Sequence, residues 1–298
     1  MLPQRPPRRA VRDSLLRALV LSSTLLAASL IFLMLAFVAG EAQPALGARG
    51  LGEFLTSASW HPTDASAPEF GLLAMLAATG ATALGALLIA GPLGVATGLF
   101  GALIAPQAWA RLQRMLIELL AGIPSVVYGL WGLVVLVPLI GAGTRSGQGL
   151  LAASLVLALM ILPTVALSTE AALQAVPREL LRGGAALGLG PIARARRIAL
   201  PAARSGIVAG FVLAIGRAIG ETMAVLMVAG NIVAWPEGLR EPLRTMTANI
   251  ALEMGYATSA HRSALFVVGL VLMMAVIALV ALAALVRGRA SSVQEARA

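Results

Sequence analysis

Two charged residues inside an apolar stretch have the types and spacing that most clearly point to chemistry. Arg217 lies near the centre of a predicted helix at about 205–229, and Glu221 follows four residues later. An arginine at the centre of a membrane helix costs about 2.5–3.5 kcal/mol on insertion scales, so helix packing does not explain its presence. The i, i+4 spacing predicts that both side chains share one face of the helix.

This pair of charges has two interpretations. In the first, the ion pair is structural and fixes the register of the helix. In the second, Arg217 faces a hydrated path and holds an anion, while Glu221 orients Arg217 or competes for it. A planar guanidinium offers paired donors that match a tetrahedral oxyanion, which favours the second interpretation. Glycines four residues apart also predict close packing of this helix: Gly206 with Gly210, and Gly216 with Gly220.

The composition places these residues in a membrane protein. The chain has 298 residues, of which 59% are apolar and 12% are charged. A soluble domain is usually about half apolar and about a quarter charged. Six stretches are long enough to cross a bilayer, at about 15–39, 72–103, 112–140, 150–175, 205–229 and 264–286. The sequence therefore predicts an all-α integral membrane protein with six transmembrane helices over 15–286.

The distribution of arginine predicts the orientation in the membrane. Of the 22 basic residues, sixteen fall in the two tails and in the loops after the second and fourth helices. Basic loops stay in the cytoplasm, so we expect both termini there, with cytoplasmic tails at 1–14 and 287–298. The first apolar stretch is about twice as long as the core of a signal peptide, which favours an uncleaved helix.

Missing residue types exclude several function classes. All basic residues are arginine, and a P-loop needs a lysine to reach the β/γ-phosphates, so any ATP chemistry must come from a partner. The chain has no cysteine, which excludes thiol chemistry. His61 and His261 lie far apart in predicted loops, which favours solvated residues over a metal pair. We therefore expect that the chain is no enzyme and has no metal, no cofactor and no nucleic-acid partner. The net charge of +9 is a signal of how the chain is oriented in the membrane.

Two of the long stretches contain a proline that predicts a bend or break. Pro92 and Pro124 each lack a backbone donor and clash with the preceding turn. Such a break at Pro124 either lines a substrate path or is a packing kink. Apolar residues at helical spacing also predict an amphipathic helix at about 242–254 in the external loop. This helix would lie on the membrane surface, pack on the bundle or meet an external partner.

The loop at about 176–204 predicts a compact cytoplasmic knob. A short apolar helix ends at Gly188, and Pro201 restarts regular structure. The loop resembles the EAA loop of ABC-transporter permease subunits, which has the pattern E-A-A-x3-G-x9-I-x-L-P. Arg182 and two glycines stand where this pattern has E-A-A. The residues that match its spacing are Gly188, Ile198, Leu200 and Pro201.

Two further segments resemble the PstC-type permease subunits of phosphate ABC importers. They read AGIPSVVYGLWG at 121–132 and GRAIGETMAV at 216–225, and the resemblance extends over about 70–286. The companion PstA-type permeases typically have G-E-T-A-P where this chain has G-E-T-M-A.

The resemblance implies a MetI-like type I importer fold in a bacterial inner membrane, with five core helices and an extra N-terminal helix. It also implies a PstA-like permease partner, two copies of a cytoplasmic ATPase on the cytoplasmic loops, and an external phosphate-binding protein. The family's in-membrane arginine and glutamate correspond to Arg217 and Glu221. Its coupling glycine corresponds to Gly188.

We therefore predict a permease subunit that passes phosphate through the lipid membrane by alternating access, driven by ATP on the partner ATPase. The predicted substrate path consists of Arg217, Glu221, Thr222 and Ser125, with main-chain amides near Pro124. The predicted ATPase-coupling residues are Arg182, Gly188, Ile198, Leu200 and Pro201. Three alternatives stay open: a permease for another oxyanion such as sulfate or molybdate, a membrane phosphate sensor or scaffold, and a passive channel.

Overall fold

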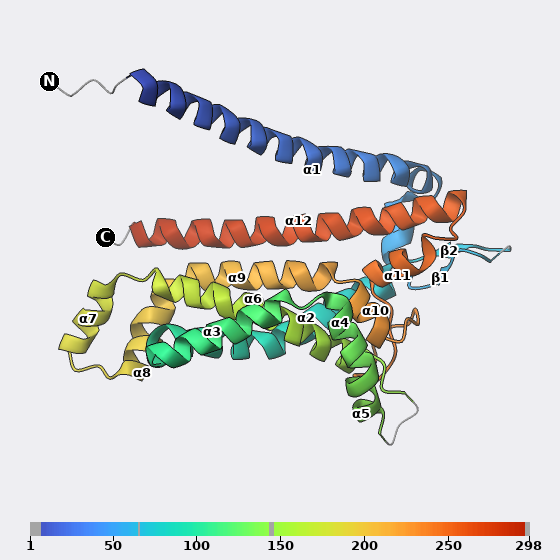
Figure 1. The fold of residues 1–298 in the computed structure, drawn as a ribbon. Coiled ribbons are helices and arrows are strands. Elements are labelled where there is room, and N and C mark those ends of the chain that lie inside the picture. The colour runs from blue at the N-terminus through green and yellow to red at the C-terminus, as the bar shows by residue number, and fades with distance from the viewer. Residues whose placement is uncertain (1–6, 65, 143–145, 296–298) are drawn as a thin grey trace.

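The computed structural model describes residues 7–64, 66–142 and 146–295, which are mostly helical (Figure 1). The long helices are α1 (Pro7–Thr56), α2 (Leu73–Leu99), α3 (Gln107–Gly122), α6 (Leu150–Gln174), α9 (Leu200–Gly220) and α12 (Ser259–Glu295). The short helices are α4 (Ser125–Trp131), α5 (Val137–Gly141), α7 (Arg178–Ala186), α8 (Pro191–Arg194), α10 (Met223–Val228) and α11 (Met246–Glu253). Three π-helical turns are η1 (Phe100–Ile104), η2 (Gly132–Leu136) and η3 (Ala195–Ala199). The strands β1 (Trp60–His61) and β2 (Glu69–Phe70) pair as an antiparallel hairpin.

The predicted all-α membrane architecture is confirmed. Among the described residues, five helices are long and apolar enough to cross a membrane, and α3 with α4–α5 forms a bent sixth. The first helix is longer than the predicted 15–39, since α1 reaches Thr56 with non-helical backbone at Gly50. The third span bends by 91° at the predicted Pro124 break, whereas α2 stays helical through Pro92. Of the predicted tails, residues 1–6 and 296–298 lie outside the described residues.

Small residues bring α2 and α6 together in the centre of the bundle. A Cβ atom on Gly94 would lie 2.7 Å from the Val165 Cβ. A Cβ atom on Gly98 would lie 2.6 Å from the carbonyl oxygen of Ala166. Backbones that approach this closely gain dispersion contacts over a long interface, which is the main driving force for helix association in lipid.

The helix α9 packs on α6 through one of its two predicted glycine pairs. Cβ atoms on Gly206 and Gly210 would lie 2.6 and 2.5 Å from the side chains of α6, which confirms the prediction for this pair. No atom lies within 4 Å of a Cβ built on Gly216 or Gly220, so the packing prediction for the second pair is wrong. These two glycines flank Arg217, on a part of α9 that stays open.

The two ends of the bundle differ, and we name them by what they carry. The coupling-loop end carries α7 and α8, together with the start of α1 and the end of α12, and the hairpin end carries β1, β2 and α11 (Figure 1). The first half of α1 stands away from the other helices (Figure 1). Its apolar side chains, such as Leu25 and Phe32, are exposed, as expected for a helix that faces lipid or another subunit.

A second apolar core lies at the hairpin end. Trp60 and Phe70 from the hairpin pack with Met246 of α11 and Leu265 of α12. The predicted amphipathic helix is therefore real and packs on the bundle, but it begins at Met246 rather than near residue 242. The hydroxyl of Thr245 accepts a hydrogen bond from the third residue of α11 and caps its start.

Candidate substrate path and coupling loop

Two transmembrane helices break in the same way. α3 ends at Gly122 and α9 ends at Gly220, and the next residues, Ile123 and Glu221, have extended backbone angles (φ −68°, ψ 128° and φ −70°, ψ 133°). After two non-helical residues α4 and α10 begin. The prediction of one continuous helix over 205–229 is therefore wrong, because the backbone leaves the helix directly after Gly220.

The segments that follow the two breaks lie against each other. A Cβ atom on Gly129 of α4 would lie 2.9 Å from the Ala224 Cα and 2.9 Å from the Met227 Sδ, both in α10. A Cβ on Gly132 would lie 3.0 Å from a methyl group of Val228. The close approach of α4 and α10 brings two breaks that are far apart in sequence into one region of the bundle (Figure 1).

Side-chain hydroxyls satisfy carbonyl groups that the two breaks expose. The hydroxyl of Tyr128 donates to the carbonyl oxygen of Leu120 at 2.7 Å, near the end of α3. The hydroxyl of Thr247 in α11 donates to the carbonyl oxygen of Glu221 at 2.7 Å. Non-helical backbone at membrane depth requires such cover by protein or by a hydrated cavity. Both breaks are thus built into the fold.

Arg217 lies in the last turn of α9, just before the break, and its side chain is exposed. Among the residues that the structure describes, no carboxylate lies within 4.0 Å of its guanidinium. The phenol of Tyr128 lies within electrostatic range of Arg217. The structural ion pair with Glu221 is therefore absent, and the positive charge of Arg217 stays available for a ligand.

Glu221 has a different local role from the one that its spacing predicted. Because it lies beyond the end of α9, it does not share a helical face with Arg217. Its carboxylate oxygen Oε1 accepts a hydrogen bond of 3.1 Å from the main-chain N–H of Ala224 and so caps α10. Thr222 lies in the same break, and Ser125 begins α4 directly after the other break. The four predicted path residues thus flank two breaks that pack together, and their roles in transport stay predictions.

The coupling loop turns at a glycine, as predicted. Gly188 follows the end of α7 with a φ of 78°, a backbone region that glycine adopts at little cost. The N–H groups of Gly188 and Leu189 donate to the carbonyl oxygens of Ala185 and Gly184, each at 3.0 Å. These bonds close the helix end in the manner of a Schellman-type cap.

The second arm of the coupling loop begins earlier than predicted. Pro191 opens α8, and the helix continues through η3 into α9, so Pro201 lies inside this helix and does not restart it. The π-helical turn η3 directly precedes Pro201 and shifts the hydrogen-bond register, which accommodates a residue without an N–H group. The side chain of Ile198 packs against Gly184 and joins the two arms.

Apolar side chains project from the tip of the coupling loop. Leu180 and Leu187 are 50% and 84% exposed. Arg182 is exposed beside them on α7. Large apolar side chains grouped on a surface outside the membrane spans are typical of a protein-binding site.

A family model supports these features. The model for the "binding-protein-dependent transport system inner membrane component" matches residues 90–290, which include both breaks and the coupling loop. The chain belongs to this family. It is therefore a multi-pass membrane permease subunit.

Individual relatives are similar to this chain over most of its length. A "probable ABC transporter permease protein YqgH" from Bacillus subtilis is 42% identical over 74% of this chain and 72% of its own. The phosphate transport system permease protein PstC from Xylella fastidiosa is 36% identical over 96% and 95%. A chain of the inward-facing MetNI methionine ABC transporter superposes with a TM-score of 0.57 at 22% identity, covering 74% of this chain and 94% of its own. The predicted MetI-like importer fold is confirmed.

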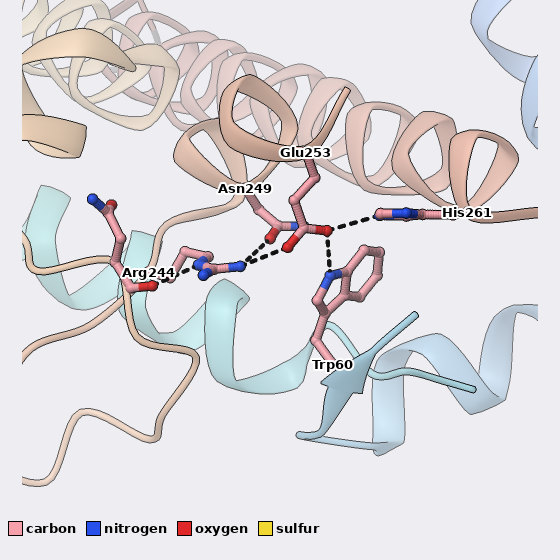
Figure 2. Close-up of polar contacts among 6 residues, drawn as sticks. Trp60, Arg244, Asn249, Glu253 and His261 are labelled. Carbon is pink, nitrogen blue, oxygen red and sulfur yellow. Dashed lines mark hydrogen bonds and ion pairs between the residues drawn. The ribbon is translucent and has the colours of Figure 1, made fainter. Parts of the chain in front are cut away.

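A buried polar cluster at the hairpin end of the permease was not predicted from the sequence (Figure 2). Glu253, at the end of α11, is 5% exposed, and its Oε2 atom lies 2.8 Å from both the Trp60 Nε1 and the His261 Nε2. Its Oε1 atom accepts a hydrogen bond of 2.7 Å from Arg244, which also donates to the side chain of Asn249 at 3.0 Å. The prediction that His261 is a solvated loop residue is wrong, because it is 4% exposed and lies in the first turn of α12.

A second ion cluster links α3 to α6 near the coupling-loop end. The Arg114 side chain donates to Glu118 at 2.9 Å and lies 3.6 Å from Glu170, for which the sequence indicated no role. Glu170 is 8% exposed and also accepts a hydrogen bond from Gln174 at 2.9 Å. The cluster connects helices and does not reach the breaks, so it is structural in this geometry.

Proposed function

We propose that this chain is the permease subunit of an ATP-driven phosphate importer and forms half of the transmembrane path. The observation that carries the proposal is the exposed guanidinium of Arg217, which has no carboxylate partner among the described residues and lies next to two packed helix breaks. A tetrahedral oxyanion matches this donor group in charge and geometry. The near full-length similarity to a PstC permease supports phosphate as that oxyanion.

A second, PstA-like permease would close the path against the open part of α9 around Arg217. Within that path, Arg217 holds the phosphate by paired N–H donors, and Ser125, Thr222 and main-chain N–H groups near Pro124 add hydrogen bonds. Alternating access exposes Arg217 first to the outside and then to the cytoplasm. The carboxylate of Glu221 lies close in sequence and limits how tightly an anion is held, which helps its release.

ATP is bound by the partners and not by this chain. Two copies of a cytoplasmic ATPase dock on the coupling loops of the two permeases, here on the apolar tip formed by Leu180 and Leu187. The turn at Gly188 transmits their movement, and Arg182 supplies a charged contact in place of the usual acidic residue. Both termini then lie in the cytoplasm, a proposal that the arginine distribution supports. An external phosphate-binding protein would deliver phosphate at the hairpin end.

The decisive experiment is uptake of radiolabelled phosphate by proteoliposomes that contain both permeases, the ATPase and the binding protein. We expect Arg217→Ala to abolish uptake while the complex still co-purifies. Arg217→Lys keeps the charge but not the paired donors, so we expect partial uptake. The control is Arg111→Ala, which removes an exposed arginine away from the path. Normal uptake by Arg217→Ala would contradict the proposal.

The same proteoliposomes separate the remaining alternatives. Excess unlabelled sulfate or molybdate should not compete with phosphate, and competition would indicate a broader oxyanion permease. Uptake should stop without ATP, since a passive channel would continue to conduct. A sensor or scaffold would give no uptake in the complete, purified system.

A further inference from the structure

An apolar cleft lies between α2, η1 and the helix that runs from α8 to α9. Its volume is about 650 Å³, which is within the range of about 300–1,000 Å³ that is usual for ligand pockets. The cleft opens sideways, since Leu88 at its edge is 69% exposed. Apart from Arg196 the lining side chains are apolar or glycine, and they include Leu88, Val95, Leu99, Ile104, Leu200 and Phe211.

A cationic hollow adjoins this cleft. The hollow has a volume of about 540 Å³ and is lined by Ile192, Ala193, Arg196 and Arg197. Ile192 and Arg196 line both spaces, so the apolar cleft ends at two guanidinium groups. Figure 1 shows the segment from α8 to the start of α9 crossing the coupling-loop end of the bundle, where the headgroup layer of the membrane would lie.

The two arginines carry positive charge without a protein counter-ion. Both are exposed, and among the described residues no carboxylate lies within 4.0 Å of either. Other arginines of the same chain do pair, as Arg114 does with Glu118 and Arg244 with Glu253. The charge at this mouth is therefore free to attract an anion from outside the chain.

We propose that the cleft and its cationic mouth bind one anionic phospholipid. An acyl chain lies in the cleft, and the headgroup phosphate accepts hydrogen bonds from Arg196 and Arg197. The cleft is formed by helices that span the membrane and opens toward lipid, so a lipid reaches it without crossing water. Basic pockets between transmembrane helices on the cytoplasmic side are known to bind anionic headgroups. Such a lipid would touch α2, α8 and α9 together and brace the coupling loop against the bundle.

The test uses the complete transporter with its ATPase, purified in mild detergent. Native mass spectrometry follows addition of dioleoyl phosphatidylglycerol and dioleoyl phosphatidylethanolamine in equal amounts. We expect wild type to retain phosphatidylglycerol in preference to phosphatidylethanolamine. The double variant Arg196→Gln/Arg197→Gln should retain at least about tenfold less phosphatidylglycerol than wild type. The matched double control is Arg111→Gln/Arg204→Gln, which removes the same charge at the same end and lines neither space.

A second pair of variants tests the cleft itself. Leu88→Trp fills the cleft from an exposed position that lines no other hollow and should reduce retention of both lipids. Leu93→Trp lies on the same helix outside the cleft and should change neither. Equal retention of phosphatidylglycerol by wild type and the arginine double variant would overturn the proposal. Equal retention of phosphatidylethanolamine and phosphatidylglycerol by wild type would also overturn it, since the mouth would then not select an anionic headgroup.

The absence of cysteine allows one further check. Leu88→Cys introduces a single thiol into this chain at the edge of the cleft, which a lipid-soluble maleimide should label in the assembled transporter. Cross-linking of this thiol to the second permease by a bifunctional maleimide, with no labelling by the lipid-soluble maleimide, would show that a protein helix fills the cleft, and the lipid site would be refuted.

Discussion

The hydroxyl of Thr247 donates a hydrogen bond of 2.7 Å to the main-chain carbonyl oxygen of Glu221. Thr247 lies in α11 at the hairpin end, whereas Glu221 lies in the break between α9 and α10. The break removes the helical partner of this carbonyl, and a lost hydrogen bond at membrane depth is costly. This contact therefore connects the hairpin end, where the binding protein would act, to the break beside Arg217.

Substitution of Thr247 tests this connection. Thr247→Val keeps the shape of the side chain but leaves the Glu221 carbonyl without its donor, so we expect a loss of about 1–3 kcal/mol in the free energy of unfolding. Thr247→Ser keeps the hydroxyl and should stay close to wild type. The midpoint of thermal unfolding in detergent measures the difference. Equal midpoints for the two variants would show that the hydrogen bond does not stabilise the break.

Glu221 should act on stability through its cap and not through its charge. Glu221→Gln keeps an oxygen that accepts from the Ala224 N–H, so we expect it to unfold near the wild-type temperature. Glu221→Ala removes the cap and should cost about 0.5–2 kcal/mol, as at other helix N-termini. If both variants were destabilised equally, the carboxylate charge would be the stabilising feature. Thermal unfolding of the purified permease distinguishes these outcomes.

Removing the Glu253 carboxylate should strongly reduce the free energy of unfolding. Glu253→Gln leaves Arg244 without its counter-ion in a site where the Glu253 side chain is 7% exposed, and breaking such a buried pair costs about 3–5 kcal/mol. Trp60→Phe removes one hydrogen bond to the same carboxylate and should cost less. The control is Glu69→Gln, whose contact with His61 is solvent-exposed and contributes little. Denaturant unfolding of the three variants should rank them in this order.

The membrane architecture was predictable because it follows from local composition. Apolar runs of bilayer length and the proline at the third span each act within a short window of sequence. Gly188 belongs to the same class, since a glycine after a short apolar helix is a local signal for a helix end. These features need no knowledge of which helices touch.

The break in α9 and the cluster around Glu253 could not be predicted in this way. No proline marks Gly220, and the residues after it read as a continuing apolar helix with a charge at i, i+4. The break is stable because Thr247, 26 residues away, satisfies the freed carbonyl. Likewise, Trp60 and Glu253 are 193 residues apart, so only the packing of the hairpin on α11 brings them together. Both features depend on tertiary contacts.

The contact between α2 and α6 predicts that alanine substitutions at two glycines of α2 have very different effects on the free energy of unfolding. A methyl group at Gly98 would overlap the Ala166 carbonyl and the Thr169 side chain, so we expect Gly98→Ala to cost about 1–3 kcal/mol. Gly80 has no atom within 4 Å of a built Cβ, so Gly80→Ala should be neutral or stabilise the helix by up to about 1 kcal/mol. Thermal unfolding measures both. A similar loss at the two positions would contradict the observed packing.

Gly188 offers the most direct test of the coupling loop. Its φ of 78° disfavours any residue with a Cβ, so Gly188→Ala should strain the turn by about 1–2 kcal/mol and shift the tip away from its docking position. Because 1.4 kcal/mol corresponds to a factor of about ten, we expect ATP-driven phosphate uptake to fall by about five- to thirtyfold. Gly188→Asn should retain more uptake, since asparagine adopts this region more readily. Gly190→Ala adds the same methyl group at a φ of −64° with open space around it and should leave uptake unchanged. Equal uptake by the variants at both positions would show that the backbone conformation at Gly188 does not matter for coupling.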